Sequence, residues 1–213
     1  MIEPSSYNPG RSDLPRRDLL KLTLAAAVLL VVPARARAAE SPSQFLDAYA
    51  NKAVDMLADP ATPEEMRVEN FEALLGEGFD IRAISQFILG RYWRTATEDE
   101  QAEFMRVFKR VLAERYTPIF AGADRSRFSV GEFQQVTGKD GLFMVNTTVV
   151  GDDGKLINLR WRVAARDLGY QILDVMVEGV SMVITLRDEY GSVIRQNGIA
   201  GLIDRLRQTL KNA

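Results

Sequence analysis

Two tight turns divide the stretch FMVNTTVVGDDGKLINLRWRVAARDLGYQILDVMVE (residues 143–178) into three segments of alternating character. The turns are GDDG (151–154) and DLG (167–169), and both carry the glycine and aspartate residues that hairpins favour. Within the segments, apolar and polar side chains alternate, which places them on opposite faces of a strand. The stretch therefore predicts antiparallel strands joined by hairpins, with one apolar and one polar face.

The faces of two of these strands can be assigned from the sequence. In the segment 156–165 one face carries Ile157, Leu159, Trp161 and Val163, and the other carries Asn158, Arg160 and Arg162. In the next segment Leu173, Val175 and Val177 share the apolar face, and Asp174, Met176 and Glu178 point the other way. Because Arg160 and Arg162 lie on the face of the strand opposite to that of Trp161, we expect them to be solvated or to contact a protein partner. A weaker strand is expected over 128–136.

Helical periodicity precedes and follows these strands. Thr97 and Glu100 have the spacing of a capping box at the start of the longest helix, and Asp80 is the expected cap of a shorter one. Apolar stripes predict helices over 42–57, 64–75, 81–88 and 98–120, and two short helices after residue 190 that divide near 197–198. We therefore expect an α+β fold: an antiparallel twisted sheet of about four strands wrapped by helices, NTF2-like or cystatin-like, with an enclosed apolar cavity.

The first 38 residues have the three-part layout of a cleavable export signal. A basic segment, PRRDLLK (15–21), precedes an apolar run over 22–32 and the small-residue segment PARARA (33–38). Eleven apolar residues would span only about 16 Å as a helix, which is too short for a bilayer core. The paired arginines favour the twin-arginine route over an ordinary secretory signal. We expect residues 39–213 to form a single domain located in the periplasm.

Charge and composition exclude several classes of function. Removing residues 1–38 takes away six basic and three acidic residues and leaves a net charge of −5, whereas nucleic-acid binding requires a basic surface. The chain has no cysteine and no histidine. Thiolate chemistry, the usual zinc ligands and histidine-dependent nucleophiles are therefore unavailable. We expect no enzymatic activity, no cofactor and no metal.

An ordered set of short motifs resembles a known family. The motifs are LGRYWR (89–94), TEDEQ (97–101) followed by Phe104, DVMVEGVS (174–181), RDEY (187–190), and the segment from Gly198 to Leu206. Together they are similar to the MlaC, or toluene-tolerance auxiliary, family of periplasmic phospholipid-binding proteins. The similarity runs from about residue 43 to 210.

The resemblance implies a lipid carrier. Such a protein holds the acyl chains of a glycerophospholipid and moves it between outer and inner membranes, as part of a transport system that maintains outer-membrane lipid asymmetry. The implied partners are a phospholipid, an inner-membrane ABC transporter complex with a membrane-anchored substrate-binding ring, and an outer-membrane lipoprotein–porin complex. The family also has members linked to hopanoids, which remain an alternative ligand.

Eleven side chains are candidates for ligand binding. They are Phe87, Arg91, Trp93, Phe104, Phe108, Tyr116, Leu159, Trp161, Val163, Val175 and Val177. The apolar members could equally form a filled core. Arg91, Trp93 and Tyr116 are expected at the mouth of the cavity, where an arginine and amphipathic aromatics can contact phosphate or glycerol oxygens.

Two other classes of function are less compatible with the sequence. A small-molecule isomerase or dehydratase on an NTF2-like cone would need a buried carboxylate with a second catalytic group. Asp174 and Glu178 point away from the predicted apolar face, and no second group stands at a useful spacing. A binding protein for a polar solute would need a polar pocket, usually between two α/β lobes. The sequence favours the lipid carrier over both.

Overall fold

The computed structural model of the chain describes residues 40–151 and 153–211. The predicted export signal therefore lies outside the described residues. The elements, in chain order, are α1 (Pro42–Leu57), α2 (Glu64–Gly78), α3 (Ile81–Leu89), the 3₁₀ turn η1 (Gly90–Arg94), α4 (Glu98–Phe120), the 3₁₀ turn η2 (Arg125–Arg127), β1 (Phe128–Gln135), β2 (Leu142–Val150), β3 (Leu156–Arg166), β4 (Gly169–Val177), β5 (Val180–Ser181) and α5 (Met182–Lys211).

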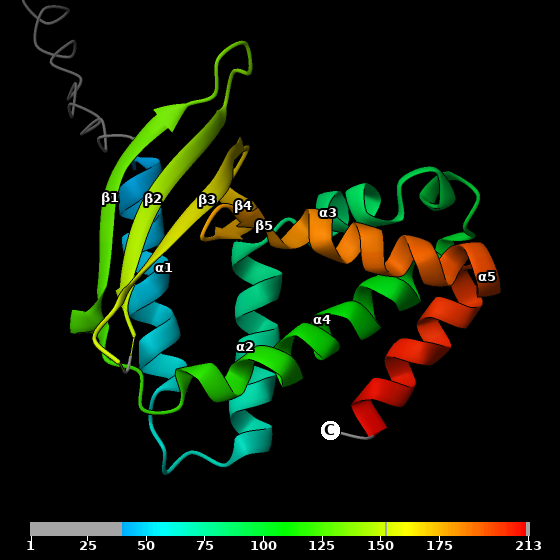
Figure 1. Cartoon of the computed structure of the whole chain (residues 1–213), viewed down its shortest axis with the longest axis horizontal. Helices are drawn as coiled ribbons and strands as arrows, with labels where there is room; N and C mark the ends of the chain where they lie inside the picture. The colour runs from blue at the N-terminus through cyan, green and yellow to red at the C-terminus, as the bar shows by residue number, and fades with distance from the viewer. Residues whose placement is uncertain (1–39, 152, 212–213) are drawn as a thin grey trace, which may run out of the picture. The chain divides into compact units, whose positions relative to one another are not determined.

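The strands form one antiparallel meander in the order β1-β2-β3-β4-β5, which confirms the predicted α+β architecture. The four strands expected from the sequence are present. The fifth, β5, has only two residues and pairs with the end of β4 through Met176↔Ser181 and Val177↔Val180. Figure 1 shows the long strands β1, β2 and β3 curving together, with α1 lying against them.

The edge strand β1 contains a bulge. Val130 is opposite Thr147, but Phe133 is opposite Val145, so two residues of β1, Gly131 and Glu132, share one position of β2. The carbonyl of Gly131 accepts a hydrogen bond of 2.9 Å from the hydroxyl of Ser43 in the first turn of α1. The bulge therefore links the sheet edge to the first helix.

A second irregularity changes the assignment of faces in β4. Arg162 pairs with Asp174 but Val163 pairs with Ile172, which makes Leu173 the extra residue. Ile172, not Leu173, is fully buried in the sheet core, so the prediction for Leu173 was wrong. The cause is the bulge itself, which shifts the alternation by one residue.

Asp174 points away from the apolar face, as predicted, and pairs with Arg162, but it is only 1% exposed. Its carboxylate accepts hydrogen bonds from the Ser181 hydroxyl at 2.7 Å and from the backbone N–H of Val183 at 3.2 Å. The guanidinium of Arg162 lies 3.7 Å away. Asp174 therefore satisfies a backbone donor at the start of α5, where the first N–H groups have no partner within the helix.

Capping side chains define the helix starts. Thr97 and Glu100 form the predicted capping box of α4, and the Asp80 carboxylate accepts from the Ala83 N–H at 2.9 Å, as predicted. Helix α5 begins at Met182, eight residues before the predicted start. It breaks at Gly198, which has φ +70° and ψ −177° and divides it into residues 182–197 and 199–211. The break near 197–198 was predicted correctly.

Three clusters of buried side chains hold these elements together. The first joins α1 to the sheet through Leu46, Val145, Val163 and Ile172; the second joins α1, α2 and α4; the third joins α3, α4 and both parts of α5. Figure 1 shows α3 and α5 beyond the β5 side of the sheet, with α4 running from beneath α5 back towards the end of α1.

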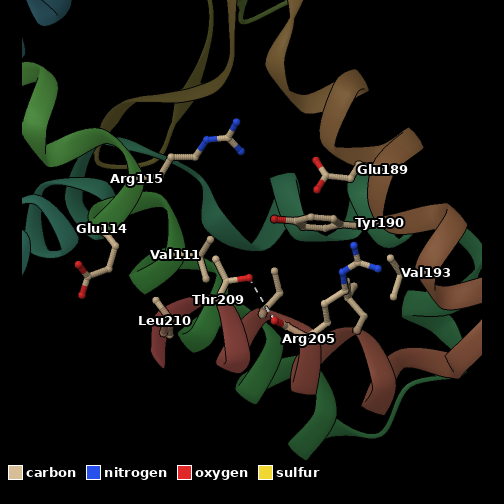
Figure 2. A pocket seen from close by; sticks show the side chains of 11 residues that line it. Val111, Glu114, Arg115, Glu189, Tyr190, Val193, Arg205, Thr209 and Leu210 are labelled. Atoms are coloured by element: carbon tan, nitrogen blue, oxygen red, sulfur yellow. Dashed lines mark hydrogen bonds between the residues drawn. The ribbon is translucent and has the colours of Figure 1, made fainter. Parts of the chain in front are cut away.

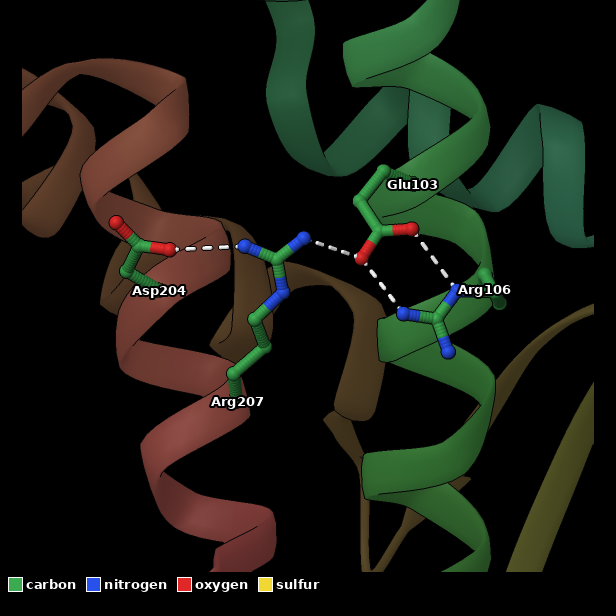
Figure 3. A network of polar contacts seen from close by, with 4 residues as sticks. All are labelled: Glu103, Arg106, Asp204 and Arg207. Atoms are coloured by element: carbon green, nitrogen blue, oxygen red, sulfur yellow. Dashed lines mark hydrogen bonds and ion pairs between the residues drawn. The ribbon is translucent and has the colours of Figure 1, made fainter.

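Charged residues also connect α4 to the second part of α5 (Figure 3). The Glu103 carboxylate accepts hydrogen bonds from Arg106 at 2.6 and 2.8 Å and from Arg207 at 2.6 Å, and Arg207 also donates to Asp204 at 2.9 Å. These guanidinium groups, Arg106 first and then Arg207, lower the pKa of Glu103 to about 2. The network therefore fixes residues 199–211 against α4.

Candidate functional site

The registers of β2, β3 and β4 place many apolar side chains on one face of the sheet. Trp161 is paired with Val145 and Val175, and Leu159 with Thr147 and Val177. We call this surface the apolar sheet face; among its residues are Val145, Val149, Ile157, Leu159, Trp161, Val163, Ile172, Val175 and Val177. It includes five of the eleven candidate residues: Leu159, Trp161, Val163, Val175 and Val177.

The apolar sheet face has a closed end and a half-open end. At the closed end Val145, Val163 and Ile172 are each 0% exposed, packed against Leu46 of α1. At the half-open end four of the candidate residues are only half-buried, and Ile157 is 37% exposed; the four are Leu159, Trp161, Val175 and Val177. Val163 is therefore part of a filled core, whereas the other four form a surface that a ligand could cover.

A hydrogen bond orients the tryptophan at the boundary between the two ends. The indole N–H of Trp161 donates to the hydroxyl of Thr147 at 2.8 Å, and Thr147 is 2% exposed. Both polar groups are thereby satisfied without water. The hydrogen bond therefore fixes the indole ring in place on the apolar sheet face.

The candidate residues of α4 and η1 lie in the helical core. Phe104 and Phe108 are 0% exposed, stacked with centroids 5.5 Å apart, and Tyr190 contacts both rings edge-on at 6.3 Å. Trp93 is 7% exposed and belongs to the same cluster. These side chains pack against other side chains of the protein, so a ligand could reach them only if the helices separated.

The remaining candidates are spread over the surface. Arg91 donates to the Tyr92 hydroxyl at 2.8 Å, and Phe87 is 42% exposed beneath the guanidinium of Arg187. Tyr116 packs at the margin of the cluster formed by α1, α2 and α4. The structure therefore does not gather Arg91, Trp93 and Tyr116 around one opening.

Sequence reasoning missed a pocket that lies between α4 and the two parts of α5 (Figure 2). It has a volume of about 320 Å³. It is lined by Val111, Glu114, Arg115, Glu189, Tyr190, Val193, Leu202, Arg205, Leu206, Thr209 and Leu210. The apolar stripe of residues 199–210 and the glycine break were visible in the sequence, but the direction that the chain takes after Gly198 was not.

Two features are absent from the described residues, 40–151 and 153–211. Within them no cluster of carboxylates suited to a metal ion occurs. In the same part of the chain no helix has both the length and the apolar character needed to cross a bilayer.

Comparison with known proteins agrees with this architecture. The family model described as MlaC protein matches residues 47–208. The MlaC binding protein of the intermembrane phospholipid transport system of Haemophilus influenzae is 18% identical over 125 residues. That alignment covers 57% of this chain and 58% of the relative, so the chain spans little more than half the length of that protein.

A solved structure shares the fold. It is the phospholipid-binding protein from Ralstonia solanacearum in complex with a phospholipid, with a TM-score of 0.65 and 19% identity over 78% of this chain and 94% of that one. The α+β fold, with an antiparallel sheet and surrounding helices, is thus that of a known phospholipid-binding protein. Since the family model matches most of the sequence, the chain belongs to the MlaC family.

Proposed function

We propose that this protein is a periplasmic carrier that binds the acyl chains of a glycerophospholipid and shuttles the lipid between outer and inner membranes. The observation that carries the proposal is the half-open end of the apolar sheet face. Leu159, Trp161, Val175 and Val177 remain half-buried next to a fully packed core. The MlaC family membership and the phospholipid-bound neighbour support the same function.

The free energy of acyl-chain hydration explains why a carrier is needed. Each methylene group moved into water costs about 0.8 kcal/mol, so a chain of ~16 carbons costs about 12 kcal/mol. A lipid therefore leaves a membrane only when an apolar surface receives it. The half-open sheet face offers such a surface, and the fixed Trp161 ring adds a large planar contact area.

The proposal extends to the partners. An ABC transporter complex with a membrane-anchored substrate-binding ring would exchange lipid with the carrier at the inner membrane. An outer-membrane lipoprotein–porin complex would do so at the other membrane, and the exchange would maintain lipid asymmetry. Arg160, which is exposed and bonded to Asn146 at 3.0 Å on the polar sheet face, is available for such a contact. Catalysis forms no part of the proposed function, because the buried Asp174 carboxylate is occupied by Ser181, Val183 and Arg162.

Native mass spectrometry of the purified protein, followed by extraction and lipid identification, tests the proposal. We expect stoichiometric phospholipid to be bound. Recovery of a hopanoid instead would reassign the ligand within the family. A protein that stays lipid-free after incubation with phospholipid vesicles would contradict the carrier function.

The location of the acyl chains is tested by a matched pair of variants. Leu159→Asn changes the half-open end, and Leu173→Asn changes a half-buried leucine of the β4 bulge that lies outside the sheet core. We expect only Leu159→Asn to reduce the amount of phospholipid retained. Equal retention by both variants would place the lipid elsewhere in the molecule.

A further inference from the structure

The pocket between α4 and α5 combines an apolar wall with a hydroxyl group that is accessible from the pocket. Leu202, Leu206 and Val111 on its wall are at most 8% exposed, and Val193 and Leu210 pack beside them. Tyr190 is 5% exposed, and its ring points its hydroxyl oxygen into the same space (Figure 2). None of the residues that the structure describes forms a hydrogen bond with this hydroxyl. The hydroxyl is open to the pocket and free to donate, so an acceptor oxygen of a ligand can take its hydrogen bond.

The tyrosine hydroxyl remains a donor at neutral pH. Burial raises the pKa of Tyr190 well above its ordinary value of 10, and the carboxylate of Glu189 adds to the shift. The neutral phenol can therefore give its proton to a hydrogen bond with an anionic oxygen.

The charges at the pocket favour an anion. Arg115 contacts the Tyr116 ring at 5.7 Å, and neither Arg115 nor Arg205 forms an ion pair with any described residue. Of the two acidic residues, Glu114 is paired at 2.8 Å with Arg110, which also pairs with Glu65 at 2.7 Å, whereas Glu189 is exposed and has no ion pair with a described residue. Two available guanidinium groups thus face one available carboxylate. Guanidinium groups bind carboxylate and phosphate oxygens in a bidentate geometry.

We propose that this pocket is a binding site for a single-chain anionic amphiphile, such as a fatty acid or a single-chain phosphate ester. The anionic head would lie between Arg115 and Arg205 with the Tyr190 hydroxyl donating to it, and the chain would cover Leu202 and Leu206. A volume of about 320 Å³ is near the lower limit for small-molecule pockets and too small for a lipid with two acyl chains. The site is independent of the phospholipid function proposed above, because it shares no residue with the apolar sheet face.

Calorimetric titration with dodecanoate, dodecyl phosphate and dodecyltrimethylammonium, each below its micellar concentration, tests the site. We expect one equivalent of either anion to bind, and the cation to bind at least tenfold more weakly. Comparison of the two anions shows which head group, carboxylate or phosphate, the arginines prefer. Equal affinity for the cation would reduce the pocket to a general detergent-binding surface and overturn the proposal.

Point variants locate the binding. Arg205→Gln should weaken dodecanoate about tenfold, and Glu189→Gln should strengthen it because a repelling charge is removed. Arg195→Gln is the matched control: it removes an exposed arginine of the same helix outside the pocket, so it should have no effect. Val193→Trp should fill the pocket and abolish binding. Unchanged affinity in Arg205→Gln would contradict the site.

A competition experiment separates this site from the phospholipid site. Protein loaded with phospholipid should bind dodecanoate with unchanged affinity. Loss of dodecanoate binding on loading would mean that the anionic group belongs to the phospholipid itself, and the separate site would be disproved. Failure of phospholipid loading would instead count against the carrier function and leave the dodecanoate result intact.

Discussion

The two ends of the apolar sheet face have the same kind of sequence but different surroundings. At the closed end Val163 and Ile172 lie beneath α1 and are 0% exposed, whereas at the half-open end Val175 and Val177 are only partly covered. All four are β-branched aliphatic residues on strands β3 and β4. The difference arises from side chains of the helices: Leu46 of α1 is buried at the closed end, and Phe79, which follows α2, packs there as well. Identical side chains can thus serve stability in one place and remain available to a ligand in another.

The largest effect is expected at the closed end. Ile172→Ala removes a fully buried side chain from a close-packed cluster, so it should lower the free energy of unfolding by about 2–5 kcal/mol. Urea denaturation measures this change. The matched variant at the other end, Val177→Ala, should cost less than about 1 kcal/mol because its site is already partly hydrated. Equal costs would mean that the two ends are equally packed.

The reverse pattern is expected for ligand binding. Val177→Asp introduces a charge where an acyl chain would lie and should reduce phospholipid affinity at least tenfold, with a smaller effect on unfolding than at the closed end. Transfer of a fluorescent phospholipid from vesicles to the protein provides the measurement. Met176→Asp, at the preceding strand position and on the opposite face, is the control and should retain binding. Normal transfer by Val177→Asp would place the ligand away from this surface.

A smaller loss of unfolding free energy is expected from a substitution at the boundary between the two ends of the apolar sheet face. Thr147→Val keeps the shape of the side chain but removes the acceptor of the Trp161 indole N–H, and should cost about 1 kcal/mol of unfolding free energy. Thr148→Val, on the neighbouring position of the other face, is the control. Tryptophan fluorescence should shift in the first variant only. An identical spectrum in both would show that the hydrogen bond does not hold the ring.

The smallest effect is expected far from the sheet, in the Glu103 network. The pKa of Glu103 is lowered to about 2 from an ordinary value of 4.5, so its ionised form is favoured by folding. Its stabilising contribution is therefore complete above about pH 4.5 and is lost as the pH falls towards 2. Since the side chains are partly solvated, Glu103→Gln should cost at most about 1 kcal/mol at pH 7. The variant should lose less stability than the unmodified protein between pH 4.5 and 2; parallel pH profiles would contradict this assignment.

The sequence predicted those parts of the fold that depend on local patterns. The hairpin turns, the capping box of Thr97 and Glu100 and the break at Gly198 each have a signature within a few residues, and each was located correctly. The β4 bulge has no such signature because Ile172 and Leu173 are adjacent apolar residues, either of which could face the core. Alternation of apolar and polar residues alone predicted Leu173, whereas Ile172 faces the core.

The candidate site was less predictable because it depends on contacts between distant segments. Whether Val163 or Val175 is covered depends on which side chains of distant helices reach the sheet, and neither strand contains that information. Phe104 and Phe108 form an apolar stripe in the sequence whether they line a cavity or fill a core; their stacking with each other and with Tyr190 fills it. The pocket beside α5 requires the angle at Gly198, which glycine permits but does not specify.

The bulge in β1 reduces the tendency of this protein to aggregate through the edge of its sheet. An edge strand exposes unpaired backbone groups that can extend the sheet into a second molecule and begin aggregation. Here Gly131 and Glu132 share one position of the ladder, so the bulge interrupts the regular spacing of these groups. The hydroxyl of Ser43 also donates a hydrogen bond to the carbonyl oxygen of Gly131. Glu132 adds a negative charge at the same position of every copy, so two such edges repel each other. The edge of the sheet is thereby protected against pairing with a second molecule.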